Sequence, residues 1–117
     1  MHPFFNPGTQ PSAAIGVLDA QWKQLHSAEV EALYPGVAAK LVITEVGWPT
    51  AGSAVGNNGS PEGAKVVYDG FKDWADKNKL GDDRTFYFQM FDQPHRENLV
   101  EQSFGISTST RNPKFAL

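Results

Sequence analysis

The first part of the chain has the apolar spacing of a helix. Over residues 11–25, apolar side chains recur every three or four positions, which predicts a helix capped by Ser12. The apolar positions of this segment are Ile15, Leu18, Trp22 and Leu25. Polar His26-Ser27 interrupts the pattern before a second short helical piece at 28–33, which Tyr34-Pro35-Gly36 ends. Trp22 is expected to be a core residue.

Residues 60–78 give the clearest helical pattern. Ser60 is a good N-cap, Pro61 suits the first helical position, and Glu62 suits the positive end of the helix dipole. One face of the predicted helix is apolar, which indicates that it packs on other elements. This face comprises Ala64, Val67, Tyr68, Phe71, Trp74 and Ala75. Its aromatic row is therefore expected to pack on a sheet instead of binding a ligand.

Two runs rich in β-branched and aromatic residues predict strands at 41–44 and 85–91. A helix lies between them, so they are expected to form a βαβ unit with parallel strands. The carboxyl ends of both strands then lie at the same edge of the sheet. Residues 51–60 are rich in Gly, Asn and Ser and predict a loop that forms one wall of a cleft at this edge.

Composition narrows the class of protein. The 117 residues fit one domain, 1–117, of α/β class, and 40% hydrophobic residues indicate a folded chain. The net charge of -3 argues against nucleic acid as a partner, and no segment has the length of a membrane span. No signal peptide is recognisable at the N-terminus. Cysteine is absent and the three histidines lack ligand spacing, so no metal and no cofactor are expected.

Glu45 is the strongest candidate for chemistry. It follows the predicted strand 41–44 directly, and Gly47, Trp48 and Pro49 come next. Parallel α/β sheets place their functional groups at this end of their strands. Trp48 offers a flat apolar surface beside the acid, of the kind on which a sugar ring stacks. The residue types alone leave a second interpretation equally open, in which Glu45 is a surface carboxylate in a turn.

The twelve residues from Leu41 to Gly52, Leu-Val-Ile-Thr-Glu-Val-Gly-Trp-Pro-Thr-Ala-Gly, closely resemble the signature of glycoside hydrolase family 17. This family contains β-1,3-glucanases and related glucanosyltransferases. The resemblance implies a TIM (β/α)8 barrel, β-glucan as the substrate, and Glu45 as the catalytic nucleophile. It also implies a secreted or cell-wall location.

Two further segments resemble landmarks of the same family. Residues 91–106 resemble the eighth barrel strand and its loop, which implies that Gln93, Arg96 and Glu101 bind near the nucleophile. Gln93 stands where the family usually has Glu, and Arg96 where it usually has Lys, so the charge pattern of the site is changed. For Arg96 and Glu101 the alternative is a solvated loop with weak ion pairs.

At the N-terminus, the sequence His-Pro-Phe-Phe at residues 2–5 resembles the end of the sixth barrel strand. The resemblance implies that Phe5 lines the substrate groove. The alternative is a hydrophobic tail inserted in the core.

The resemblance covers the C-terminal portion of a barrel: the end of strand six, strands seven and eight, and their helices. A retaining glycosidase needs a second carboxyl group, and the family's Asn-Glu pair that supplies it is not found here. The isolated chain is therefore expected to be inactive and marginally stable, and to self-associate through exposed strand edges. Two alternatives stay open: a non-catalytic glucan-binding or interaction module derived from such a barrel, and an unrelated small α/β protein.

Overall fold

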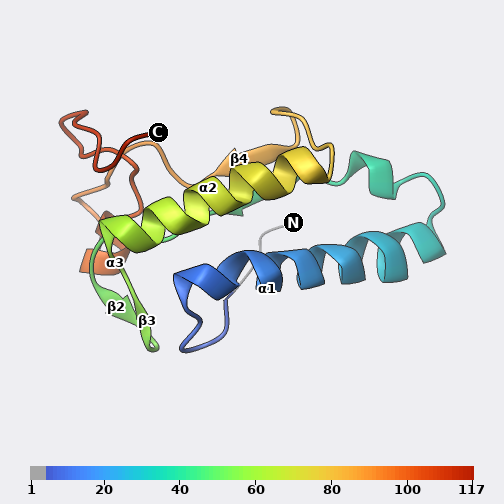
Figure 1. Ribbon diagram of the computed structural model, residues 1–117, viewed down its shortest axis with the longest axis horizontal. Helices are drawn as coiled ribbons and strands as arrows, with labels where there is room; N and C mark the ends of the chain where they lie inside the picture. The colour runs from blue at the N-terminus through green and yellow to red at the C-terminus, as the bar shows by residue number, and fades with distance from the viewer. Residues whose placement is uncertain (1–4) are drawn as a thin grey trace.

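The computed structural model describes residues 5–117, in which two long helices are combined with short strands (Figure 1). In chain order the elements are α1 (Pro11–Lys23), the π-helix η1 (Gln24–Glu31), the 3-10 helix η2 (Ala38–Lys40), β1 (Ile43–Val46), β2 (Ser53–Ala54), β3 (Asn57–Asn58), α2 (Pro61–Lys77), β4 (Thr85–Tyr87) and α3 (Leu99–Gln102).

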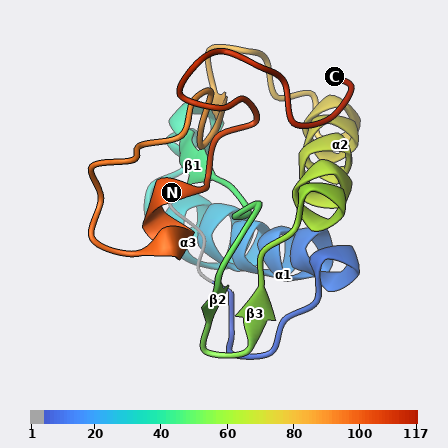
Figure 2. The same ribbon diagram turned by 90° about the vertical axis from the view of Figure 1, so that its left-hand side faces the viewer.

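β1 and β4 form a two-stranded parallel sheet, and α2 connects them. The predicted βαβ unit is therefore confirmed. β2 and β3 form a separate antiparallel hairpin in the segment predicted to be a plain loop. In the view of Figure 2, this hairpin lies below α1 and α2.

The core lies between the two helices and the sheet. Trp22 of α1 and Trp74 of α2 are both buried and meet edge to face, with ring centroids 5.7 Å apart. The Trp74 indole N–H also donates to the Asp19 carboxylate at 3.0 Å. Ile43 and Val46 of β1 are buried in the same cluster. The expected core role of Trp22 is confirmed, and the aromatic face of α2 is shared between the sheet and α1.

The start of α2 agrees with the prediction in detail. The Ser60 side chain accepts a hydrogen bond of 2.9 Å from the Gly63 amide, Pro61 is the first helical residue, and Glu62 lies in the first turn. Such a cap satisfies a donor that the helix leaves unpaired.

The predictions for the first helix were less accurate. Gln10 occupies the N-cap position without a side-chain bond, and Pro11 starts the helix, so Ser12 is not its cap. The expected interruption at His26-Ser27 is also wrong. No Gly or Pro breaks the segment, and the backbone continues as the π-helix η1 through both residues.

Strand β1 begins later than predicted. Leu41 still bonds back to Ala38 at the end of η2, so the extended segment starts at Ile43 and includes Glu45. The acid is thus part of the strand and does not come after it.

Strand β4 is shorter than the predicted 85–91. The Phe88 amide still donates to the Val46 carbonyl, and beyond it the chain leaves β1 and bonds to the C-terminal segment instead. The Gln89 amide donates to the Phe104 carbonyl, and the Asp92 amide donates to the Ser107 carbonyl. The second half of the apolar run therefore forms an irregular layer with residues 104–107.

Several apolar side chains around β4 face solvent. Phe86 is 49% exposed, Met90 56% and Phe91 42%. Within residues 5–117, no helix has both the length and the apolar character that crossing a membrane requires. The predicted end of strand six at residues 2–4 lies outside the described residues.

Candidate active site

Glu45 lies at an irregularity in the pairing of β1 with β4. Ile43 is opposite Thr85 and Val46 is opposite Tyr87, so β1 contains one residue more than β4 over this stretch. Ile43 and Val46 are both buried on the helix side. They are three positions apart, and in a regular strand residues at that spacing face opposite sides of the sheet. An inserted residue of this kind turns a side chain out of the regular alternation. Here it leaves Glu45 half-buried on the open side of the sheet.

Gly47 allows the two strands to come together directly after Glu45. A Cβ atom at this position would lie 1.9 Å from the Phe88 carbonyl oxygen. Only glycine fits such a contact. The role of Gly47 is therefore to allow this close approach of two backbones.

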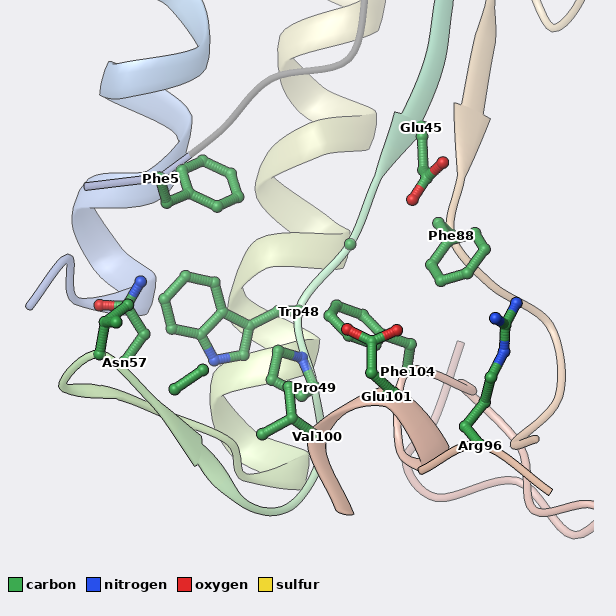
Figure 3. A pocket seen from close by; sticks show the side chains of 13 residues that line it. Phe5, Glu45, Trp48, Pro49, Asn57, Phe88, Arg96, Val100, Glu101 and Phe104 are labelled. Atoms are coloured by element: carbon green, nitrogen blue, oxygen red, sulfur yellow. The ribbon is translucent and has the colours of Figure 1, made fainter. Parts of the chain in front are cut away.

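Glu45 lines a cavity of about 550 Å³ between the ends of β1 and β4 and the β2–β3 hairpin (Figure 3). Its lining is Phe5, Glu45, Gly47, Trp48, Pro49, Ala54, Val55, Asn57, Phe88, Arg96, Val100, Glu101 and Phe104. Four predicted site residues besides Glu45 therefore share one cavity: Phe5, Trp48, Arg96 and Glu101. The predicted cleft wall from residues 51–60 is confirmed by Ala54, Val55 and Asn57.

One end of the cavity is aromatic. Phe5 and Trp48 pack with ring centroids 5.7 Å apart, and the indole N–H donates to the Asn58 carbonyl at 3.1 Å. Trp48 is only 1% exposed. It is therefore a fixed part of the wall instead of the open stacking surface that we expected from the sequence. Phe5 is half-buried and contacts both the core and the cavity.

The other end carries charge. In Figure 3, the Arg96 guanidinium and the Glu101 carboxylate extend into the space below Glu45. Arg96 comes from the loop after β4, and Glu101 from α3, whose first turn is capped by the Asn98 side chain. Carboxylates and a guanidinium in one cavity are suited to bind the hydroxyl groups of a sugar and to stabilise charge.

Gln93 does not line the cavity, although we predicted that it binds substrate. Its side-chain oxygen accepts from Arg96 Nε at 2.7 Å, and its amide nitrogen donates to Gln89 Oε1 at 2.7 Å. Because both ends of its amide are engaged with protein, Gln93 holds Arg96 in place.

A polar cluster that the sequence did not predict joins the loops that build the cavity. Lys114 Nζ lies 2.6 Å from Asp92 Oδ1 and 2.5 Å from Thr50 Oγ1. Asp92 also accepts from the Gly105 amide at 3.1 Å, and Thr50 donates to the Ser103 carbonyl at 2.8 Å. The C-terminal segment thus fixes the loop after β1 relative to the loop after β4.

Sequence reasoning also missed the apolar lining residues Phe88 and Phe104. Phe88 was assigned to the middle of a strand, and its position at the cavity depends on where β4 ends. Across the described part of the chain, no group of three or more His, Asp or Glu side chains is arranged to hold a metal ion.

Comparison with known proteins shows the family to which the chain belongs. The model of the BtgE/BtgC glycoside hydrolase domain matches residues 1–105. A glucan endo-1,3-beta-glucosidase of Solanum tuberosum, basic isoform 1, is 25% identical over 100% of this chain and 40% of its own length. A probable glucan endo-1,3-beta-glucosidase of Arabidopsis thaliana is 26% identical over 93% of this chain and 34% of its own length. The chain thus spans well under half the length of the curated relatives it matches.

The solved structures agree on the fold. The glycoside hydrolase family 17 β-1,3-glucanosyltransferase from Rhizomucor miehei is 26% identical, with a TM-score of 0.69 over 91% of this chain and 36% of that chain. An active-site mutant of the Rhizomucor miehei β-1,3-glucanosyltransferase, in complex with laminaritriose, gives a TM-score of 0.73 at 24% identity over the same shares of the two chains. With the family model matched over most of its length, the chain belongs to the BtgE/BtgC glycoside hydrolase domain family and has an α/β fold that matches family 17 enzymes.

Proposed function

We propose that the chain is the C-terminal part of a retaining glycoside hydrolase that acts on β-1,3-glucan, with Glu45 as the nucleophile. The observation that carries this proposal is the position of Glu45 at the end of β1, facing a cavity of about 550 Å³ together with Arg96 and Glu101. Family membership supports it, and so do the names of the relatives. A secreted or cell-wall location belongs to the same proposal.

In the proposed reaction, a carboxylate oxygen of Glu45 forms a bond to the anomeric carbon while the bond to the leaving oxygen breaks. A second carboxyl group protonates the leaving oxygen and later removes a proton from the incoming hydroxyl of water or of another glucan. We assign this acid/base to no residue of the present chain. Arg96 donates hydrogen bonds to sugar hydroxyls, and Glu101 accepts them.

The alternative is a glucan-binding module without catalysis. The aromatic wall at Phe5 and Trp48 favours it, since binding a sugar needs this wall and no acid/base group. Both proposals predict glucan binding, and only the first predicts attack by Glu45.

A substrate with an activated leaving group separates the two. Dinitrophenolate leaves without protonation, so 2,4-dinitrophenyl β-laminaribioside requires a nucleophile but no general acid. We expect one equivalent of dinitrophenolate per chain, with a matching mass increase of the protein by one laminaribiosyl group. Glu45→Gln removes the attacking charge and keeps the shape, so it is expected to give neither signal.

The binding control uses calorimetry with laminarihexaose, and with cellohexaose as the matched β-1,4 ligand. Binding of laminarihexaose without any dinitrophenolate release would support the module and overturn the nucleophile. Absence of binding to laminarihexaose would overturn both.

A further inference from the structure

The tip of the β2–β3 hairpin has an unusual backbone. Its two turn residues, Val55 and Gly56, both have positive φ, 47° and 83°. Two-residue hairpin turns of this type favour Asn-Gly or Gly-Gly, because asparagine and glycine adopt the left-handed region at low cost. Valine is β-branched, and for such residues a positive φ is a genuine outlier. Local folding preferences therefore disfavour valine at this position.

Burial does not explain the choice of residue. Val55 is 70% exposed, so its side chain contributes little to the hydrophobic core. Because so little of the side chain is buried, packing offsets little of the strain in its backbone. Strained residues of this kind cluster at ligand sites, where surrounding contacts hold them in place.

Such contacts surround Val55. Its carbonyl accepts a hydrogen bond of 3.1 Å from the Gly8 amide, and the Asn57 side chain donates to the Asn6 carbonyl at 3.3 Å. On the other side, the hairpin is bonded to the buried indole of Trp48 through Asn58. The tip is thus tied both to the segment before α1 and to the aromatic wall of the cavity.

Val55 also lines the cavity that contains Glu45, together with Phe5 and Trp48. In Figure 3 the hairpin runs along the side of the cavity next to Trp48, away from Arg96. Because Trp48 itself is covered, an exposed and rigidly held apolar group beside it is suited to pack against the CH face of a sugar ring.

We propose that Val55 is a specificity-determining residue that packs on a glucose unit bound at the aromatic end of the cavity. This inference rests on the proposed function, since it takes β-1,3-glucan as the ligand. It assigns the hairpin tip a role in binding the chain of the glucan at a distance from the reacting bond.

The test measures affinity and stability in the same set of variants. Val55→Gly and Val55→Asn fit the backbone, so both are expected to raise Tm by about 2–6 °C. Both remove the apolar contact, so affinity for laminarihexaose is expected to fall about three- to tenfold. Val55→Thr keeps the branching and the strain while replacing a methyl by a hydroxyl. It is expected to lower affinity without raising Tm.

Val66 provides the matched control. It is a half-exposed valine on α2 that does not line the cavity. Val66→Thr is expected to leave laminarihexaose affinity within twofold of that of the unchanged chain.

If the unchanged chain binds laminarihexaose and the three Val55 variants bind equally well, the role of Val55 is overturned and the proposed function stands. If the unchanged chain does not bind, the proposed function fails and this inference fails with it. A lower Tm in Val55→Gly and Val55→Asn would contradict the strain on which the inference depends.

Discussion

The two sides of the β1–β4 sheet differ sharply. On the helix side, Ile43 and Val46 are covered by an apolar core that includes Phe71 and Trp74. On the other side, Phe86 is half-exposed, and Glu45 faces the cavity with Arg96 and Glu101 beyond it. One side is closed by the packing of two helices on the sheet. The other is open and depends on loops that are far apart in the sequence.

This difference indicates how stability and function are divided. On the closed side, α1 and the βαβ unit of β1, α2 and β4 share one apolar core, so this side is expected to set most of the unfolding free energy. The open side is arranged by polar contacts such as Lys114–Asp92 and Gln93–Arg96. Substitutions there are expected to change the geometry of the cavity more than the fold.

The largest effect is expected on the closed side. Trp74→Ala removes an edge-to-face contact with Trp22, a stacked contact with Phe71 and the hydrogen bond to Asp19. We expect a loss of about 3–5 kcal/mol in unfolding free energy. The matched change on the open side, Phe86→Ala, is expected to cost about 1 kcal/mol or less. Urea denaturation followed by circular dichroism measures both, and equal losses would contradict the comparison.

An intermediate effect is expected at the polar cluster. Lys114→Met leaves the Asp92 carboxylate, only 19% exposed, without its cation. We expect a loss of about 2–4 kcal/mol, because removing one partner of a nearly buried pair leaves the other charge uncompensated. The exposed pair gives the control: Lys23→Met, where Lys23 is 69% exposed and faces Asp19, is expected to cost less than about 1 kcal/mol. Similar losses of unfolding free energy in the two variants would contradict the idea that burial makes the Lys114–Asp92 pair the more important one.

The smallest effect concerns pH. Hydrogen bonds from Lys23 and from the Trp74 indole hold the pKa of the Asp19 carboxyl below its ordinary value. Because the folded-state pKa is the lower one, this stabilisation is complete above the unfolded pKa of about 4 and is lost as pH falls through the folded pKa. Asp19 is 31% exposed, so the contribution is below about 1 kcal/mol.

Comparing the unchanged chain with Asp19→Asn by urea denaturation at pH 7 and at pH 2.5 measures this contribution. The unchanged chain is expected to be the more stable at pH 7, and the difference is expected to shrink at pH 2.5. A difference that grows in acid would contradict the assignment.

Sequence patterns predicted the parts of the fold that short-range rules determine. The cap at Ser60, the proline after it and the apolar face of α2 are all local, and the structure confirms them. Parallel pairing of β1 with β4 followed from the helix between them. The prediction that Ser12 caps the first helix was wrong, because Pro11 already starts that helix.

The candidate site was predicted in part because its residues follow strands. Five of the six predicted side chains line one cavity, and the sixth, Gln93, holds one of them. The extra residue in β1, the early end of β4 and the Lys114 cluster were missed. Each depends on pairing between segments distant in the chain, such as Gln89 with Phe104 and Lys114 with Thr50. No periodicity within one segment contains that information.

The extra residue in β1 limits how this segment can change in length. Deleting Thr44 or Glu45 would restore the regular alternation, with Ile43 and Val46 still on the helix side and one residue between them on the open side. Deletion of Thr44 would place the carboxylate at a regular strand position, without the extra residue that sets its direction, and deletion of Glu45 would remove the carboxylate. Relatives with the same chemistry are therefore expected to keep the extra residue in this strand.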